Sequence, residues 1–370
     1  MEAGDLKPHT VIAGSGKMAR NIGLLFLRHG YAVTWTSRDV DACNEAFTAH
    51  MRRDLRRLAR SIPEIDTTPP ALRSPRDPTI PPAQIVVEST VESLAAKHAM
   101  LGQLNPLISE DTLLLSNSSS LLPASIHPRC VGFHFFYPIQ LSGVVELITP
   151  PSVRAVDMQK IQQLLTQMGL HAIRQTETSA FAINRLLLSV QAECFRMLTL
   201  GRDAATIDEA SASCLLPMGQ LSLIDSVGID TIHASVINYV DRMSGDEAPA
   251  FLPLVSGLEV LLGCGKRGKK SHNGLLSGEP LPWNVSHAGS DGALATKLLY
   301  LFMNRCYHFL GSSQITASEL DVVLQSVFHA ECSLEDVLNR EGRNQVVDAL
   351  AQWHAESGVS YFQPARALLE

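Results

Sequence analysis

Four polar residues in this chain have the types and spacing needed to take a proton from an alcohol. A histidine accepts the hydroxyl proton, a carboxylate orients the imidazole and stabilises its positive charge, and two hydrogen-bonding groups hold the oxygen. The sequence offers these groups at Ser119 in S-N-S-S-S, His134 in G-F-H-F-F-Y-P, Glu146 in G-V-V-E-L-I and Asn184 in F-A-I-N-R. We therefore predict an enzyme whose central feature is a His134–Glu146 pair.

Each of these residues also has a purely structural interpretation. A histidine between two phenylalanines is often a hydrogen-bonded core residue, an asparagine that opens a helix can be its cap, and a serine can cap a helix or form a turn. In this chain His134 occurs together with Glu146 downstream of a nucleotide-binding pattern. That combination favours the catalytic interpretation.

The start of the chain has the pattern of a dinucleotide-binding strand, turn and helix. A short apolar strand over 9–13 is followed by G-x-G-x-x-A and then by the apolar face of a helix. The first glycine permits a tight turn, the second lets the backbone approach a pyrophosphate, and the helix N-terminus offers N–H groups to the phosphates. The residues predicted to bind the cofactor here are Gly14, Ser15, Gly16, Lys17 and Met18.

The second predicted strand, over 31–36, ends in Ser37, Arg38 and Asp39. NAD-binding sites usually place an acidic residue at this point, against the ribose 2′-hydroxyl. Here Ser37 occupies that position, and a hydroxyl followed by a guanidinium can bind the 2′-phosphate of NADP(H). The pattern therefore favours NADP(H) as the cofactor, while NAD(H) stays open if Asp39 reaches the ribose.

Apolar strands and helical segments alternate up to about residue 178, and helices follow. This order predicts an α/β fold with a Rossmann-like, mostly parallel sheet, followed by an all-α region. Within that region Asn304-Arg305 echoes Asn184-Arg185, which indicates two related helical units. A duplicated unit can bury the face that a single unit buries by dimerising, so we expect a monomer. The expected domains are an NAD(P)-binding domain over 1–178, a first helical domain over 179–285 and a second, diverged copy over 286–370.

The composition excludes several classes of protein. The 370 residues include 45% hydrophobic and 18% charged side chains, and the formal charge of −7 provides no basic field to attract nucleic acid. The apolar stretch over 294–310 is interrupted by Lys297, Asn304 and Arg305, and the first residues lack a secretory pattern, so we expect a cytoplasmic protein without a membrane partner. Seven single cysteines without a C-x-x-C pair predict no metal site and reduced, mostly buried thiols.

Six longer phrases share their order with a known family. They are V-V-E-S-T-V-E-S-L-A-A-K at 86–97, S-N-S-S at 116–119, H-F-F-Y-P at 134–138, V-E-L-I at 145–148, I-N-R-L-L at 183–187 and P-M-G-Q-L-S-L-I-D-S-V-G-I-D-T at 217–231. Through them nearly the whole chain resembles the 3-hydroxyacyl-CoA dehydrogenase family, including the dehydrogenase part of multifunctional fatty-acid oxidation proteins. Tyr137 stands where that family usually has an asparagine.

The resemblance implies an NAD(P)-dependent oxidoreductase that interconverts 3-hydroxyacyl and 3-oxoacyl thioesters. The implied substrate is an acyl thioester of coenzyme A or of a carrier protein. By resemblance the general base falls on His134, its carboxylate partner on Glu146, and the groups that hold the substrate oxygen on Ser119 and Asn184. The acidic residue and the lysine that the family places beside the nicotinamide fall on Glu92 and Lys97.

A predicted helix over 40–61 carries a run of arginines beside an apolar stripe. Such a run is most simply a solvated helix face. Its functional alternative is a docking patch for a coenzyme A phosphate or an acidic carrier protein, which would make the chain a carrier-protein-linked hydroxyacyl dehydrogenase of a specialised biosynthetic pathway. An alternative from a different class is a nucleotide-binding protein that has lost catalysis. The arginines are Arg52, Arg53, Arg56, Arg57 and Arg60.

Overall fold

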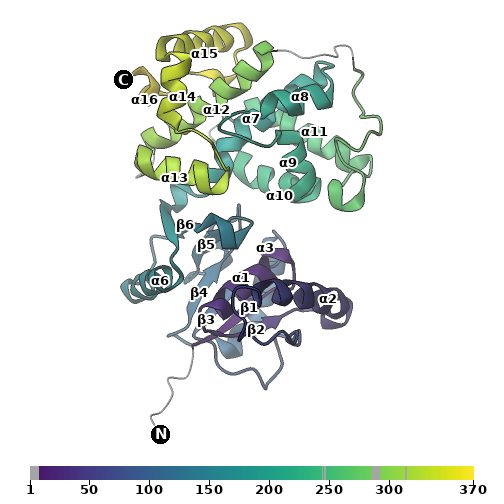
Figure 1. Ribbon diagram of the computed structural model, residues 1–370, viewed down its shortest axis with the longest axis vertical. Coiled ribbons are helices and arrows are strands. Elements are labelled where there is room, and N and C mark those ends of the chain that lie inside the picture. The colour runs from purple at the N-terminus through teal and green to yellow at the C-terminus, as the bar shows by residue number, and fades with distance from the viewer. Residues whose placement is uncertain (1–7, 244, 246, 286–291, 313–314) are drawn as a thin grey trace. The chain divides into compact units, whose positions relative to one another are not determined.

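The computed structural model describes residues 8–243, 245, 247–285, 292–312 and 315–370. The chain forms two compact units, Met1–Ala180 and Phe181–Glu370. The first unit holds a sheet with its helices and the second is helical, as Figure 1 shows. The predicted α/β class and the mostly parallel sheet are confirmed. The division of the helical part into two domains stays a prediction.

Seven strands form one sheet in the order β2-β1-β3-β4-β5-β6-β7. Neighbouring strands run parallel except β5 and β6, which are antiparallel. The carboxyl ends of β1, β3, β4 and β5 therefore lie at one edge, where open α/β sheets bind their ligands. The strands are β1 His9–Ala13, β2 Ala32–Thr36, β3 Ile85–Glu88, β4 Leu113–Ser116, β5 Val131–Phe135, β6 Val144–Thr149 and β7 His171–Thr176.

Helices bury both faces of this sheet. Along β1, Ile12 belongs to a core that includes Phe26 of α1, whereas the preceding Val11 belongs to a second core that includes Leu104 of α3. Burial on both faces explains why the strands are continuous apolar runs without alternation. The helices of this unit are α1 Lys17–Arg28, α2 Val40–Leu58, α3 Leu94–Leu104, α4 Pro123–Ile126, α5 Ile139–Ser142 and α6 Ala155–Met168.

The connection after α2 differs in part from the expectation. A helix up to residue 61 was predicted, but α2 ends at Leu58 and a turn follows, in which the amides of residues 60 and 61 donate to carbonyls three residues earlier at 3.2 and 3.0 Å. Residues 63–82, which are rich in proline, contain no helix or strand. The Ser37 amide donates to the Arg73 carbonyl at 2.9 Å, so part of this connection lies against the end of β2.

The second unit is built around α7, which buries most of its length. Its Leu186 and Phe195 are buried, and the helix packs against α8, α9, α11 and α12. Further helices of the described residues complete the unit. Their bounds are α7 Ala182–Thr199, α8 Ala204–Ser211, α9 Gln220–Val227, α10 Ile229–Val240, α11 Leu252–Gly263, α12 Gly292–Ser312, α13 Ala317–Val327, α14 Leu334–Glu341, α15 Arg343–Ser357 and α16 Arg366–Leu369.

Two aspartates of this unit make the same contact at corresponding places. Asp208 Oδ1 accepts from the Ser222 amide at 2.8 Å near the start of α9, and Asp321 Oδ1 accepts from the Leu334 amide at 2.9 Å at the start of α14. A carboxylate that accepts from the first turn of a helix satisfies an amide that has no partner inside the helix. The recurrence of this contact supports the predicted repeat.

Candidate active site

His134 and Glu146 are direct partners across the antiparallel pair of β5 and β6. His134 Nδ1 lies 2.7 Å from Glu146 Oε2, and Gln175 Nε2 of β7 donates to Glu146 Oε1 at 2.7 Å. Glu146 is fully buried and His134 is 6% exposed. The carboxylate accepts the Nδ1 proton, which fixes the imidazole tautomer and orientation, so Nε2 is the ring nitrogen that could exchange a proton with a bound molecule.

The pleat of β5 explains why His134 stands apart from its phenylalanine neighbours. Phe133 and Phe135 point to one core, where their ring centroids lie 5.1 Å apart. His134 projects from the opposite face, with its ring 4.7 Å from that of Phe136. The same face needs Gly132, because a Cβ there would lie 2.8 Å from Ile148 Cβ. The contact with a buried carboxylate fits both a proton-transfer histidine and a hydrogen-bonded core histidine, so the catalytic interpretation stays a prediction.

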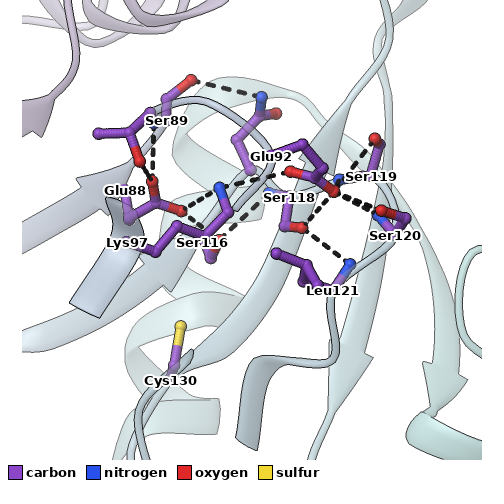
Figure 2. A network of polar contacts seen from close by, with 12 residues as sticks. Glu88, Ser89, Glu92, Lys97, Ser116, Ser118, Ser119, Ser120, Leu121 and Cys130 are labelled. Carbon is purple, nitrogen blue, oxygen red and sulfur yellow. Dashed lines mark hydrogen bonds and ion pairs between the residues drawn. The ribbon is translucent and has the colours of Figure 1, made fainter. Parts of the chain in front are cut away.

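A loop of three serines follows β4 and is held by one carboxylate, as Figure 2 shows. Glu92 Oε1 accepts from Ser118 Oγ at 2.6 Å, from the Ser120 amide at 2.8 Å and from the Ser119 amide at 3.0 Å. The Ser119 hydroxyl lies farther away, at 3.4 Å. Burial acts to raise the pKa of Glu92, but the Lys97 charge and hydrogen bonds from Ser118 and Ser120 lower it below its usual value.

Lys97 lies in the interior and joins two acidic residues. Its side chain is 1% exposed, and its Nζ lies 2.8 Å from Glu88 Oε2 and 3.4 Å from Glu92 Oε2. The lysine therefore orients Glu92 toward the serine loop. The placement of Glu92 and Lys97 beside a nicotinamide stays a prediction.

The serine loop is also tied to the strand that carries His134. Asn117 Oδ1 accepts from the Phe135 amide at 3.0 Å, so the end of β4 is fastened to β5. The sequence interpretation missed Asn117, Gln175 and Glu88. For Glu88 a signal existed, because an acidic residue that ends a run of buried apolar residues must have partners.

The glycine turn after β1 fits a dinucleotide phosphate. Gly14 has φ 143°, and a Cβ there would lie 2.4 Å from the Ser89 carbonyl oxygen, so only glycine permits this approach. A Cβ on Gly16 would meet nothing within 4 Å, and no side chain of the described residues caps α1 at this residue. The amides at the start of α1 therefore face open space, as an anion site requires.

The other predicted cofactor residues surround this turn. Ser15 and Met18 are half-buried, and Lys17 is exposed with its Nζ 3.3 Å from the centre of the Tyr137 ring. This contact places a cation, stacked on an aromatic ring, beside the turn. Gln140 Nε2 donates to Asn21 Oδ1 at 3.2 Å, so the segment after β5 contacts α1 at a second point.

The three polar residues that follow β2, at positions 37–39, differ in their contacts. Ser37 is 8% exposed, and its hydroxyl contacts the Asp39 backbone at 3.2 and 3.3 Å. Asp39 Oδ1 accepts from the Ala42 amide at 3.0 Å and so caps α2. Arg38 is exposed. Among the described residues, Ser37 makes the turn contact and Asp39 the cap contact, whereas the Arg38 guanidinium makes neither.

Asn184 belongs to the second unit and is half-buried in the first turn of α7. Its Nδ2 donates to the Tyr239 hydroxyl of α10 at 3.3 Å. The cap position of α7 is Phe181, which has a left-handed backbone with φ 59°. The alternative that Asn184 is the helix cap is therefore wrong.

Two structural features bear on other functions. Within the described ranges no group of three or more His, Cys, Asp or Glu residues is arranged to hold a metal ion, and no helix there is long and apolar enough to cross a bilayer. The seven cysteines, all described, are free thiols; three are buried and Cys264 is exposed. The expectation of mostly buried thiols is thus only partly met.

Comparisons with known proteins agree on one family. Residues 9–178 match the family described as 3-hydroxyacyl-CoA dehydrogenase, NAD binding domain, and residues 181–277 match its C-terminal domain. The mitochondrial hydroxyacyl-coenzyme A dehydrogenase of Sus scrofa is 26% identical over 289 residues, which span 73% of this chain and 90% of that protein.

Solved structures show the same fold over the whole chain. The match to the 3-hydroxybutyryl-CoA dehydrogenase of Escherichia coli spans 98% of this chain and 98% of that protein, with a TM-score of 0.76 and 18% identity. The dehydrogenase part of multifunctional enzyme 1 from Caenorhabditis elegans covers 99% of this chain and 89% of its own, with a TM-score of 0.59 and 16% identity. With both family domains matched in order, the chain belongs to the 3-hydroxyacyl-CoA dehydrogenase family of NAD-dependent oxidoreductases that act on a CH–OH group.

Proposed function

We propose that this protein interconverts 3-hydroxyacyl and 3-oxoacyl thioesters, with His134 as general acid and base assisted by Glu146. The observation that carries the proposal is the 2.7 Å contact between His134 Nδ1 and a fully buried Glu146 carboxylate. A buried carboxylate that orients an imidazole is the arrangement of a proton-transfer pair. Its retention weighs against the alternative of a nucleotide-binding protein without catalysis.

The chain's own residues divide the work of the reaction. A bound nicotinamide cofactor supplies the acceptor or donor of the hydride. In oxidation His134 Nε2 takes the hydroxyl proton of the substrate, and Glu146 stabilises the imidazolium that forms; in reduction His134 returns the proton. Ser119 is proposed to donate to the substrate oxygen as negative charge develops there. Asn184 is proposed as a second donor to that oxygen.

For the cofactor, the family domain is an NAD-binding domain, and we propose the finer preference for NADP(H). The phosphates are assigned to residues 14–18, where the glycine turn and the open end of α1 can receive them. Asp39 caps α2 while Arg38 is exposed, which supports a 2′-phosphate contact by Arg38 rather than a ribose contact by Asp39.

One assay tests the reaction and the cofactor together. Nicotinamide absorbance is followed with acetoacetyl thioester of coenzyme A and with NADH or NADPH in turn. The proposal expects oxidation of the reduced cofactor, with a higher kcat/KM for NADPH than for NADH, and a loss of that difference in Arg38→Ala. No turnover with either cofactor would reject the reaction; a higher kcat/KM for NADH would reject only the cofactor preference.

One observation favours acyl groups bound to a carrier protein as the substrate class. The exposed arginines at positions 52, 53, 56, 57 and 60 line one surface depression of the C-terminal part of α2. Asp54, which contacts Arg20 and Arg53, is the acidic residue of the described chain that lies among them. This basic surface suits an acyl group delivered by an acidic carrier protein.

The chain is further proposed to be a monomer. Within the second unit α12 packs against α7 and α8, so the second predicted copy covers part of the first. An apolar face that is covered inside one chain needs no second chain. Light scattering should give the mass of one chain, and a mass of two chains would contradict the proposal.

A further inference from the structure

We propose that Glu88 is a positioning residue for the reaction, because it fixes, through Lys97 and Ser116, the serine loop over 117–121 that presents Ser119. This inference rests on the proposed function, in which Ser119 binds the substrate oxygen. Glu88 itself is fully buried and acts only through its neighbours. Figure 2 shows the carboxylates of Glu88 and Glu92 on either side of the Lys97 amine.

Glu88 ends β3 at the edge of the sheet where ligands bind, and it joins three segments. One oxygen accepts from the Thr90 amide at 2.7 Å and from the Thr90 hydroxyl at 2.5 Å. The other accepts from Lys97 Nζ at 2.8 Å and from Ser116 Oγ at 2.7 Å. The loop after β3, helix α3 and the end of β4 are therefore held at one carboxylate. Four donors fill its accepting capacity, as burial of a charge demands.

The first route from Glu88 to the loop passes through Ser116. The Ser116 hydroxyl donates to Glu88 and accepts from the Ser118 amide at 3.1 Å. Ser118 Oγ in turn accepts from the Leu121 amide at 3.0 Å. These hydrogen bonds therefore hold both ends of the turn that contains Ser119, at Ser118 and at Leu121.

The second route passes through Lys97 to Glu92. The amine is closer to Glu88 than to Glu92, at 2.8 against 3.4 Å. Glu88 therefore takes the larger share of the lysine charge and leaves Glu92 Oε1 for the loop, where it accepts from Ser118 and Ser120. Without the Glu88 charge, Lys97 would attract Glu92 more strongly and draw that carboxylate away from the loop.

Ser119 is the residue most sensitive to such a shift. Its amide and hydroxyl lie 3.0 and 3.4 Å from Glu92 Oε1, farther away than the Ser118 hydroxyl at 2.6 Å and the Ser120 amide at 2.8 Å. A small displacement of Glu92 therefore changes the Ser119 contacts first. The shift should appear mainly in the rate of the reaction, because the cofactor phosphates are assigned to residues 14–18 of another turn, which keep their contacts.

The test replaces Glu88 by glutamine, which keeps the size of the side chain but not its charge. With acetoacetyl-CoA and saturating cofactor, Glu88→Gln should lower kcat by about 100-fold, while KM for the thioester and the Kd of NADPH stay within about twofold. Circular dichroism gives the folded fraction, to which the rates are scaled. A merely structural residue would lower that fraction and leave the scaled kcat unchanged.

A double-mutant cycle separates action through Lys97 from an independent effect. If Glu88 acts largely through Lys97, the loss of kcat in the double variant Glu88→Gln with Lys97→Met should be clearly less than the product of the two single losses. Asp157→Asn is the matched control, because Asp157 is also buried and bound by Arg154 at 2.6 and 2.7 Å at the start of α6. It should reduce stability without reducing the scaled kcat.

Two outcomes overturn the inference. One is an unchanged scaled kcat in Glu88→Gln, and the other is a pair of losses that multiply fully in the double variant. If Glu88→Gln does not fold, Ser116→Ala breaks the first route alone and should lower kcat by about tenfold; an unchanged kcat there rejects the inference equally. A wild-type protein without activity on any thioester would reject the proposed function, and this inference with it.

Discussion

In the proposed reaction, Glu146 determines which nitrogen of His134 exchanges a proton with the substrate. Its Oε2 accepts from Nδ1 at 2.7 Å and its Oε1 accepts from Gln175 at 2.7 Å, so the carboxylate is held at both ends. Because Glu146 is fully buried, its charge is poorly screened at the imidazole. In the proposed oxidation, the Glu146 charge would therefore stabilise the imidazolium of His134 where it forms.

Glu146→Gln should lower kcat by about 100-fold, since an amide can hold the ring but cannot balance its positive charge. The Kd of the nicotinamide cofactor, measured by fluorescence, should not change. Gln175→Leu is a control that removes only the second contact of Glu146 and should cost less than the charge itself. Equal kcat in wild type and Glu146→Gln would mean that the pair is structural.

Glu92 makes the stability of the first unit depend on pH. Its folded pKa lies below the ordinary value of 4.5, so its charged form stabilises the folded state above pH 4.5 and this contribution is lost as pH falls through the lowered pKa. The Glu92→Gln variant lacks this stabilisation by a charged carboxylate at every pH. The Tm difference between wild type and this variant should be constant from about pH 7 to about pH 5 and shrink below that. A difference that grows in acid would contradict the direction of the shift.

The contact between His134 and Glu146 was predictable from residue types, because a histidine and a glutamate downstream of a nucleotide-binding pattern favour a proton-transfer pair. The catalytic role of the pair stays a prediction. Gln175 was not predictable, since a glutamine in a half-polar strand gives no sign of its partner. For Glu88 the sequence signalled that a buried charge must have partners, but it did not show which ones. The partners Lys97 and Ser116 lie on two other segments of the chain.

At the level of elements, the reversal of β6 is what brings Glu146 opposite His134. The connection over 136–143 is shorter than the dozen or more residues that a parallel crossover needs, so β6 must run antiparallel to β5. This length was readable in the sequence, although the strand order was not. The parallel strands were predictable from the alternation of strands and helices, because that order leaves helices to cover both faces.

The basic face of α2 gives a prediction about the acyl carrier. Arg53→Glu with Arg57→Glu should raise KM for an acyl group on an acidic carrier protein by at least about tenfold and make it less sensitive to salt, because attraction becomes repulsion. KM for an acyl thioester of pantetheine, which lacks the carrier's charge, should be unchanged. Arg28→Glu on α1 is a control for a general change of surface charge. Loss of activity with both substrates would instead indicate damage to the fold.

The second unit is held together across long sequence separations by one buried carboxylate. Glu193 of α7 is fully buried, binds Arg196 at 2.7 Å, accepts from the Tyr361 hydroxyl at 2.7 Å and lies 3.3 Å from Lys297 of α12. Burial and the Glu193 charge raise the pKa of Tyr361, so its hydroxyl stays protonated as a donor. The sequence indicated the repeat but not this link, because Lys297 and Tyr361 both lie more than a hundred residues from Glu193.

Glu193→Gln should lower the free energy of unfolding of the second unit by about 3 kcal/mol, because it leaves the half-buried cations of Arg196 and Lys297 without the charge of their partner. Urea unfolding followed by tryptophan fluorescence measures the change, since Trp283 and Trp353 belong to this unit. Glu370→Gln breaks an exposed ion pair with Arg366 and should cost less than about 0.5 kcal/mol. Similar losses in both variants would mean that Glu193 is not a central contact.

The most direct test of the proposed chemistry is the turnover of His134→Gln. Glutamine keeps a polar side chain of similar reach but cannot take the substrate proton, so kcat with acetoacetyl-CoA should fall by about two to four orders of magnitude while the Kd of the cofactor is unchanged. Normal turnover in the folded variant would contradict the assignment of proton transfer to His134.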